Sequence, residues 1–177
     1  MMRLAVLSVA LLLPRAVVPA QQSKPAGHWD SWQFLVGEWV GEGGGQPGQG
    51  TGSFSFRFEL QGKVLVRRNR SDYPAAKDRP AYSHEDLMIV YPDPGGNSMR
   101  AVYFDNEGQV IHYTAQFSPD QKTLTFLSDV APGAPRFRLT YTKSGGATLG
   151  LKFDIAPPGK PDSFSTYIEA VCRKKAD

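Results

Sequence analysis

The sequence contains little cysteine, little histidine and little excess positive charge, each of which marks a specialised class of protein. It has one cysteine and three histidines in 177 residues, so an internal disulfide is impossible and soft metal ligands are scarce. Its 20 Lys and Arg are nearly balanced by 17 Asp and Glu, which is not the strongly basic footprint of a nucleic-acid binder. These absences indicate an ordinary globular domain whose core holds without cross-links, and Cys172 is expected to be a small buried apolar residue.

Residues 1–20 have the layout of a secretory signal peptide. Arg3 gives a positive start, the uncharged run 4–13 follows, and Val18-Pro19-Ala20 supplies small residues at the cleavage position. A membrane anchor is the alternative, but the run has about half of the roughly 20 residues needed to span a bilayer, and Arg15 interrupts it. Cleavage leaves 18 basic and 17 acidic residues, a net charge of +1. We therefore expect a periplasmic or secreted protein with no stable membrane insertion after cleavage and no nucleic-acid partner.

The remainder is expected to form one domain of antiparallel strands. Residues 21–33 are interpreted as a lead-in and short helix, and residues 34–174 as the domain itself. Beyond the helix, apolar residues recur with the period of two that is typical of strands. The ten candidate strands are 38–42, 51–60, 63–72, 82–91, 98–105, 109–118, 121–128, 135–143, 147–155 and 162–173.

These strands predict an all-β fold, an antiparallel up-and-down β-barrel of about ten strands with a short N-terminal helix. Short turns rich in Gly, Pro, Asn and Asp separate the strands, and no helical pattern long enough to connect parallel strands interrupts them. A sandwich is the alternative. Closure into a barrel covers the apolar face and removes the sheet edges. A barrel of this size is wider than side chains fill easily, so an internal cavity is expected.

Three turns predict strand alignments that place apolar side chains together on one face. The expected pairs are Tyr103 with Ile111, Ala101 with Tyr113 and Met99 with Ala115; Tyr113 with Phe126 and Ala115 with Leu124; and Tyr141 with Leu149, Leu139 with Leu151 and Phe137 with Phe153. The Gly-rich stretch 41–52 is interpreted as a mobile hairpin loop near the barrel mouth.

The segment Phe34-Leu35-Val36-Gly37-Glu38-Trp39 lies at the start of the first strand. A Gly-x-Trp motif there, after a short helix and ahead of an antiparallel barrel, resembles the calycin superfamily over about residues 34–174. The resemblance implies that Trp39 plugs the closed end of the barrel near a basic residue late in the last strand, here Arg173 or Lys174. The strand count and the phrase Tyr103-Phe104-Asp105-Asn106-Glu107-Gly108 are more similar to nitrobindin-like barrels and bacterial lipocalin-like domains.

Nitrobindin-like barrels hold haem through a histidine near the end of the barrel. No histidine follows His112 in this chain, so the haem ligand has no counterpart. The resemblance is therefore not extended to haem, and no cofactor is expected.

Arg68 is the candidate anchor of a ligand. A three-residue loop at Gln61-Gly62 would place Phe54 opposite Arg68, on the inward face that also carries Phe56 and Phe58. A buried guanidinium needs a partner, and a carboxylate or phosphate of a ligand suits its planar fork. The alternatives are an internal ion pair with Glu85 or Asp86, or a strand end that has reached solvent. The other candidate lining residues are Phe56, Phe58, Tyr103, Tyr113, Phe126 and Tyr141, with simple packing as the alternative reading.

His84-Glu85-Asp86 is the densest acid–histidine cluster. Alternation places His84 and Asp86 on one face, which is too few ligands for a metal site, and a solvated strand start is the favoured interpretation. His112 is expected to be an exposed surface histidine. No catalytic residue and no metal site are assigned.

Three functions remain open. The first is an exported lipocalin-like protein that binds a small hydrophobic or amphipathic molecule in the barrel cavity. The second is a hydrolase or isomerase on the same barrel, with the His84/Asp86 region or Tyr103 as the acid–base group. The third is a structural or interaction module with a filled barrel. Whether His84, Glu85 or Asp86 faces the cavity separates the first two, and a solid interior would leave only the third.

Overall fold

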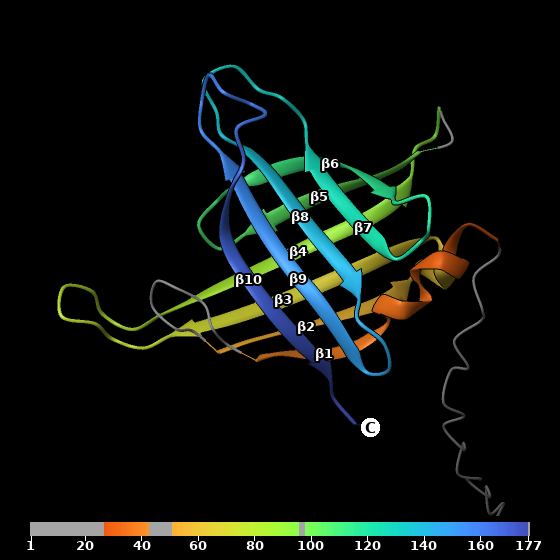
Figure 1. The fold of residues 1–177 in the computed structure, drawn as a ribbon, viewed down its shortest axis with the longest axis horizontal. Helices are drawn as coiled ribbons and strands as arrows, with labels where there is room; N and C mark the ends of the chain where they lie inside the picture. Colours follow the sequence, from red (N-terminus) through yellow and green to blue (C-terminus); the bar gives the residue numbers. More distant parts are fainter. Residues whose placement is uncertain (1–26, 43–50, 96–97, 177) are drawn as a thin grey trace, which may run out of the picture.

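The chain folds as a closed antiparallel barrel of ten strands (Figure 1). The computed structural model describes residues 27–42, 51–95 and 98–176. The expected signal peptide and most of the Gly-rich 41–52 stretch lie outside these ranges. The strands are β1 (Gly37–Glu42), β2 (Thr51–Glu59), β3 (Val64–Tyr73), β4 (Tyr82–Pro92), β5 (Met99–Asp105), β6 (Val110–Phe117), β7 (Thr123–Ser128), β8 (Arg136–Lys143), β9 (Thr148–Ala156) and β10 (Ser165–Lys174).

Neighbours along the chain are neighbours in the sheet, and β1 pairs with β10 to close the ring. The all-β fold class and the up-and-down barrel are therefore confirmed. The period-two alternation explains why: one face of each strand carries apolar side chains, and closure buries that face without leaving an open sheet edge.

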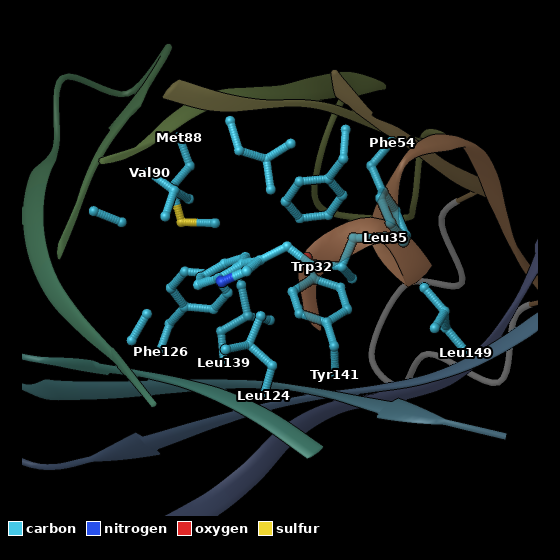
Figure 2. Packing of buried hydrophobic residues seen from close by; sticks show 14 of the residues in the cluster. Trp32, Leu35, Phe54, Met88, Val90, Leu124, Phe126, Leu139, Tyr141 and Leu149 are labelled. Atoms are coloured by element: carbon cyan, nitrogen blue, oxygen red, sulfur yellow. The ribbon is translucent and has the colours of Figure 1, made fainter. Parts of the chain in front are cut away.

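One end of the barrel is covered by η1 (Gly27–Leu35), a short 3-10 helix where the sequence predicts a helix. Trp29, Trp32 and Leu35 are fully buried. Figure 2 shows Trp32 reaching from this helix into the barrel interior. Its ring centre lies 5.4 Å from that of Phe117 and 5.9 Å from that of Phe126. The helix thus fills this end of the barrel, which we call the η1 end.

Trp39 fixes the junction between η1 and β1. Its indole Nε1 donates a hydrogen bond of 2.8 Å to the carbonyl oxygen of Leu35. Lys174 is its cross-strand partner on β10, and the Lys174 Nζ lies 5.8 Å from the indole centre. A basic residue late in the last strand therefore accompanies Trp39. Gly37, two residues earlier, has φ of +126°, a backbone conformation that side-chain-bearing residues rarely adopt and that favours glycine.

The expected register is correct at one of the three turns and shifted by two residues at the others. Tyr103 pairs with Ile111, as expected. Across β6–β7 and β8–β9, however, Tyr113 pairs with Ser128 and Tyr141 with Leu151. Both turns are longer than expected: Ser118 N donates to Thr123 O, and Ser144 N donates to Thr148 O. Because the shift is an even number, the same side chains still point inward.

Candidate functional site

The space inside the barrel, which we call the lumen, has two halves of different character. At the η1 end, inward-facing side chains such as Phe56, Leu65 and Leu124 are completely buried. Toward the far end, inward-facing side chains remain half-buried although they lie on the core side of the sheet; these are Tyr103, Ile111, Phe137, Leu151 and Phe153. The inward-facing side chains of the far half are therefore partly accessible to solvent.

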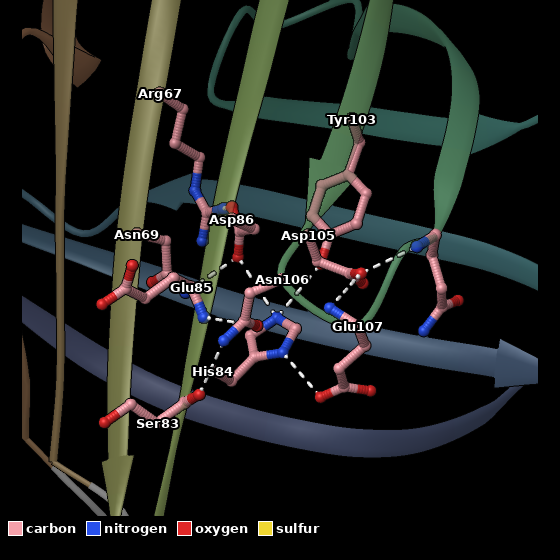
Figure 3. Close-up of polar contacts among 11 residues, drawn as sticks. Arg67, Asn69, Ser83, His84, Glu85, Asp86, Tyr103, Asp105, Asn106 and Glu107 are labelled. Atoms are coloured by element: carbon pink, nitrogen blue, oxygen red, sulfur yellow. Dashed lines mark hydrogen bonds and ion pairs between the residues drawn. The ribbon is translucent and has the colours of Figure 1, made fainter.

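One wall of the far half is polar and is built by β3, β4 and β5 (Figure 3). Arg67 on β3 and Asp86 on β4 form an ion pair with side chains only 7% and 4% exposed. Asn69 Nδ2 donates a 2.8 Å hydrogen bond to the other oxygen of Asp86. Burial opposes ionisation of Asp86, but Arg67, His84 and Asn69 together outweigh it and hold the pKa of Asp86 below its usual range. Both members of the pair are thus charged inside the barrel.

His84 extends this cluster toward the far end. Its Nε2 lies 3.1 Å from the Tyr103 hydroxyl and 3.5 Å from Asp86 Oδ2, and its Nδ1 lies 3.1 Å from Glu107 Oε1. The Asp86 carboxylate raises the pKa of His84 to about 9, burial opposes this, and Glu107 adds to it. At neutral pH the ring is therefore an imidazolium that donates from both nitrogens.

The β5–β6 turn holds the cluster rigid. The Tyr103 hydroxyl donates to Asp105 Oδ2 at 3.3 Å, and Asp105 Oδ1 accepts the backbone N–H groups of Glu107 and Gln109 at 3.0 and 2.9 Å. Asn106 Nδ2 donates to the backbone carbonyl of Ser83 on β4 at 3.0 Å. The polar wall is therefore preorganised before any ligand arrives.

The opposite wall is apolar. In a closed ring of ten strands, β8, β9 and β10 lie directly across from β3, β4 and β5. Their half-buried inward side chains are Phe137, Leu151, Phe153, Ile168 and Ala170. The rings of Phe137 and Phe153 are stacked with centres 5.8 Å apart. The far half of the lumen is thus two-faced, with hydrogen-bonding groups on one side and hydrocarbon on the other.

The expectation that Arg68 projects into the interior is wrong. The β2–β3 connection contains η2 (Leu60–Gly62) and Lys63, so Glu59 pairs with Val64 and the loop has one residue more than expected. Phe54 consequently faces Asn69, and Phe56 faces Arg67. Arg68 points outward with 66% of its side chain exposed. The buried guanidinium belongs to Arg67, and its partner is Asp86, one of the two internal partners considered for Arg68.

The other candidate lining residues are distributed between the two halves. Phe56, Phe126 and Tyr141 are fully buried, and Phe58 packs against Trp29 with ring centres 5.2 Å apart. These side chains belong to the packed core. Tyr113 is also buried in the core, whereas Tyr103 is half-buried beside the polar wall; their rings meet edge to face at 6.4 Å.

The interpretation of His84-Glu85-Asp86 as a solvated strand start is also wrong. His84 and Asp86 face the lumen, and only Glu85 lies on the outer face, where it pairs with Arg70. The long β3–β4 hairpin explains the error. It extends beyond the neighbouring strands (Figure 1), so residues near its base still lie within the barrel wall. His112 is exposed and Cys172 is buried, as expected.

Sequence reasoning missed Arg67, Asn69, Asp105 and Glu107 as members of the site. Arg67 and Asn69 could have been identified from which residues of β3 point inward, and the length of the β2–β3 loop decides this. Two buried polar atoms remain without a hydrogen-bond partner among the described residues: Arg67 Nε and the hydroxyl oxygen of Tyr141. Burial raises the pKa of Tyr141 to about 12, with Arg67 acting in the opposite direction.

Comparisons with known proteins do not add a family assignment. No family model matches the chain, and no curated protein matches it. Within residues 27–42, 51–95 and 98–176, no three His, Cys, Asp or Glu side chains converge as a metal site. In the same part of the chain, no helix is long and apolar enough to cross a membrane.

Proposed function

We propose that this protein binds a small amphipathic molecule in the far half of the barrel lumen. The observation that carries the proposal is the two-faced lumen, in which charged and hydroxyl groups from β3–β5 face hydrocarbon from β8–β10. Ligand pockets usually combine a mostly apolar lining with a few fixed polar groups. The apolar part of the ligand packs on Leu151 and Phe153, and its polar part faces His84 and Tyr103.

Export of the protein is part of the proposal and is supported by the character of residues 1–20. A barrel in the periplasm or outside the cell that shelters an apolar molecule from water acts as a carrier or scavenger. The resemblance to calycins supports the same class of function.

The inward placement of His84 and Asp86 also bears on the enzyme alternative. At neutral pH, His84 is protonated because its pKa is raised to about 9, so it donates a hydrogen bond rather than removing a proton. Its hydroxyl neighbour, Tyr103, has a pKa raised above its ordinary value, chiefly by burial. These protonation states do not suit His84 or Tyr103 as a general base at neutral pH.

The experiment that tests binding uses the amphipathic fluorophore 1-anilinonaphthalene-8-sulfonate. Leu151→Trp fills the far half of the lumen from the apolar wall. Val171→Trp places the same side chain on the outer face of the neighbouring strand, where Val171 is 48% exposed. Fluorescence titration should give saturable binding to the wild type and to Val171→Trp, and at least tenfold weaker binding to Leu151→Trp.

Far-UV circular dichroism confirms that both variants are folded. Native mass spectrometry of the purified wild type then identifies molecules that remain bound. Equal affinity of the fluorophore for Leu151→Trp and the wild type, with both folded, would rule out the lumen as the binding site.

A further inference from the structure

A hollow lies on the outside of the barrel, across β1 to β5. Its volume is about 570 Å³. Two transverse rows of outward-facing side chains flank it. One row is Glu38, Ser55, Arg68, Leu87 and Phe104, and the other includes Ser53, Arg70, Glu85 and Asn106. The floor between the rows is formed by the intervening residues Trp39, Phe54, Asn69, Asp86 and Asp105, whose side chains point inward. We call this feature the outer groove.

The outer groove is long and open. It crosses five adjacent strands, which corresponds to roughly 19 Å from four inter-strand spacings of about 4.8 Å. A groove of this shape suits a linear chain. An extended peptide gains little there, because every strand of the closed sheet is already paired on both sides and the floor has no free edge for strand addition.

The charge in the centre of the outer groove is only weakly compensated. Arg68 is 66% exposed, and its nearest carboxylate, that of Glu59, is 3.9 Å away. Other charges are better paired: Glu38 accepts from Arg57 at 2.7 Å, and Arg70 contacts both Asp72 and Glu85. Lys175, which also lines the outer groove, lies 3.7 Å from Glu38 and lacks a planar fork. The planar guanidinium of Arg68 is therefore the group best placed to take a carboxylate in a bidentate contact.

The remaining lining combines hydroxyl and apolar groups. The side-chain hydroxyls of Ser53 and Ser55 make no hydrogen bond within the described residues. At the other end of the outer groove, Phe104 is 39% exposed beside Leu87. Hydroxyl partners together with a flat apolar surface match the two faces of a sugar ring.

We propose that the outer groove binds a linear oligosaccharide that carries carboxylate groups, with a carboxylate on Arg68 and a sugar ring on Phe104. This site is separate from the lumen, because the sheet lies between them.

Isothermal titration with tetragalacturonate, a linear tetrasaccharide with one carboxylate per ring, tests this site. Binding to the wild type should be saturable, and Arg68→Ala should weaken it about tenfold or more because a charge-assisted contact is lost. Lys122→Ala removes one positive charge from the β6–β7 turn outside the outer groove and should leave the affinity unchanged. Phe104→Ser should weaken binding, and neutral maltotetraose should bind less tightly than tetragalacturonate.

Three results would overturn the proposal. They are the absence of saturable binding at millimolar tetragalacturonate, equal affinities for the wild type and Arg68→Ala, and binding of a tetraglutamate peptide as tight as that of tetragalacturonate. The lumen variant Leu151→Trp separates this proposal from the previous one. It should retain tetragalacturonate binding while it loses the fluorophore.

Discussion

The charges inside the barrel set the chemistry of the polar wall. Arg67 and Asp86 are both more than nine-tenths buried, and removing one partner of such a pair generally costs about 3–5 kcal/mol because the other charge is stranded. Replacing both by apolar residues is often neutral. A charged pair at this position is therefore better explained by the polar lumen surface that it creates than by stability.

His84 makes folding stability depend on pH. Its pKa is raised from 6.5 to about 9 in the folded protein, so the folded state binds its proton more tightly. The resulting stability is fully present below pH 6.5 and is lost as the pH rises through 9, up to roughly 3 kcal/mol. Urea unfolding at several values between pH 6 and pH 10 should show this loss in the wild type, and His84→Gln should lack that part of the pH dependence.

The matched control for this prediction is His112→Gln, since His112 is exposed on the outer face. It should follow the wild-type profile. An NMR titration of the His84 ring gives its pKa directly, and a midpoint near 6.5 would contradict the contacts to Asp86 and Glu107.

The identity of the buried arginine shows what limits reasoning from sequence at single positions. Alternation along β3 separates Arg67 from Arg68 correctly, but it does not say which of them points inward. One extra loop residue, Lys63, decides it, because an odd shift exchanges the two faces of a strand. The sequence alone therefore indicates a buried arginine, with an internal acidic partner as one of the alternatives, while assigning it to Arg68 instead of Arg67.

Strands and turns are more predictable than single positions, for the same geometric reason. The expected turns after Phe117 and Lys143 were each short by two residues, and an even shift keeps every inward residue inward. The apolar sides of β6 to β9 were therefore predicted correctly although the partners were wrong. Turn length depends on backbone conformations such as φ of +57° at Gln121, which neither composition nor periodicity reveals.

The η1 helix is expected to contribute to the core mainly through Trp32. Because its indole packs against Phe117 and Phe126 inside the barrel, Trp32→Ala leaves a large void and should destabilise the fold by about 3–5 kcal/mol. Gln33→Ala, on the exposed side of the same helix, should change stability by less than about 0.5 kcal/mol. Urea unfolding monitored by circular dichroism measures both changes.

An equal loss in the two variants would show that η1 contributes through its backbone and not through the indole. A loss below about 1 kcal/mol for Trp32→Ala would show that the barrel is filled without the helix. Either outcome would remove the physical basis for dividing the lumen into a packed half and an accessible half.

The overall architecture was predictable because few arrangements of these ten strands bury the apolar face of every strand. Ten antiparallel strands with one apolar face each need that face covered, and no other element in the described chain is large enough to cover it. Closure of the barrel covers the apolar faces, and it takes place at the seam where β1 pairs with β10, the first and last strands of the described chain. The contents of the lumen were not predictable in the same way, since they depend on the register of β2, β3 and β4.

Closure at this seam can be tested with the single natural cysteine. Gly41 is the cross-strand partner of Cys172, and antiparallel partners have Cα atoms about 4.5–5.5 Å apart, within the range that a disulfide bridges. A Cβ at Gly41 would meet only the backbone oxygen of Gly52, at 3.6 Å. Gly41→Cys should therefore form a disulfide with Cys172 on oxidation and stabilise the barrel by up to about 4 kcal/mol, because the closed loop contains most of the chain.

Gly150→Cys is the control, because Gly150 pairs with Val171 and so lies on the outer face, away from the buried Cys172. Mass spectrometry under non-reducing conditions detects the bond, and urea unfolding of the oxidised and reduced forms measures its effect. If Gly41→Cys stays reduced under these conditions, Gly41 and Cys172 are not cross-strand partners, and the β1–β10 seam closes in another register or not at all. Because Trp39 lies on the same strand two residues before Gly41, the test addresses both the closure of the barrel and the position of the plug at its η1 end.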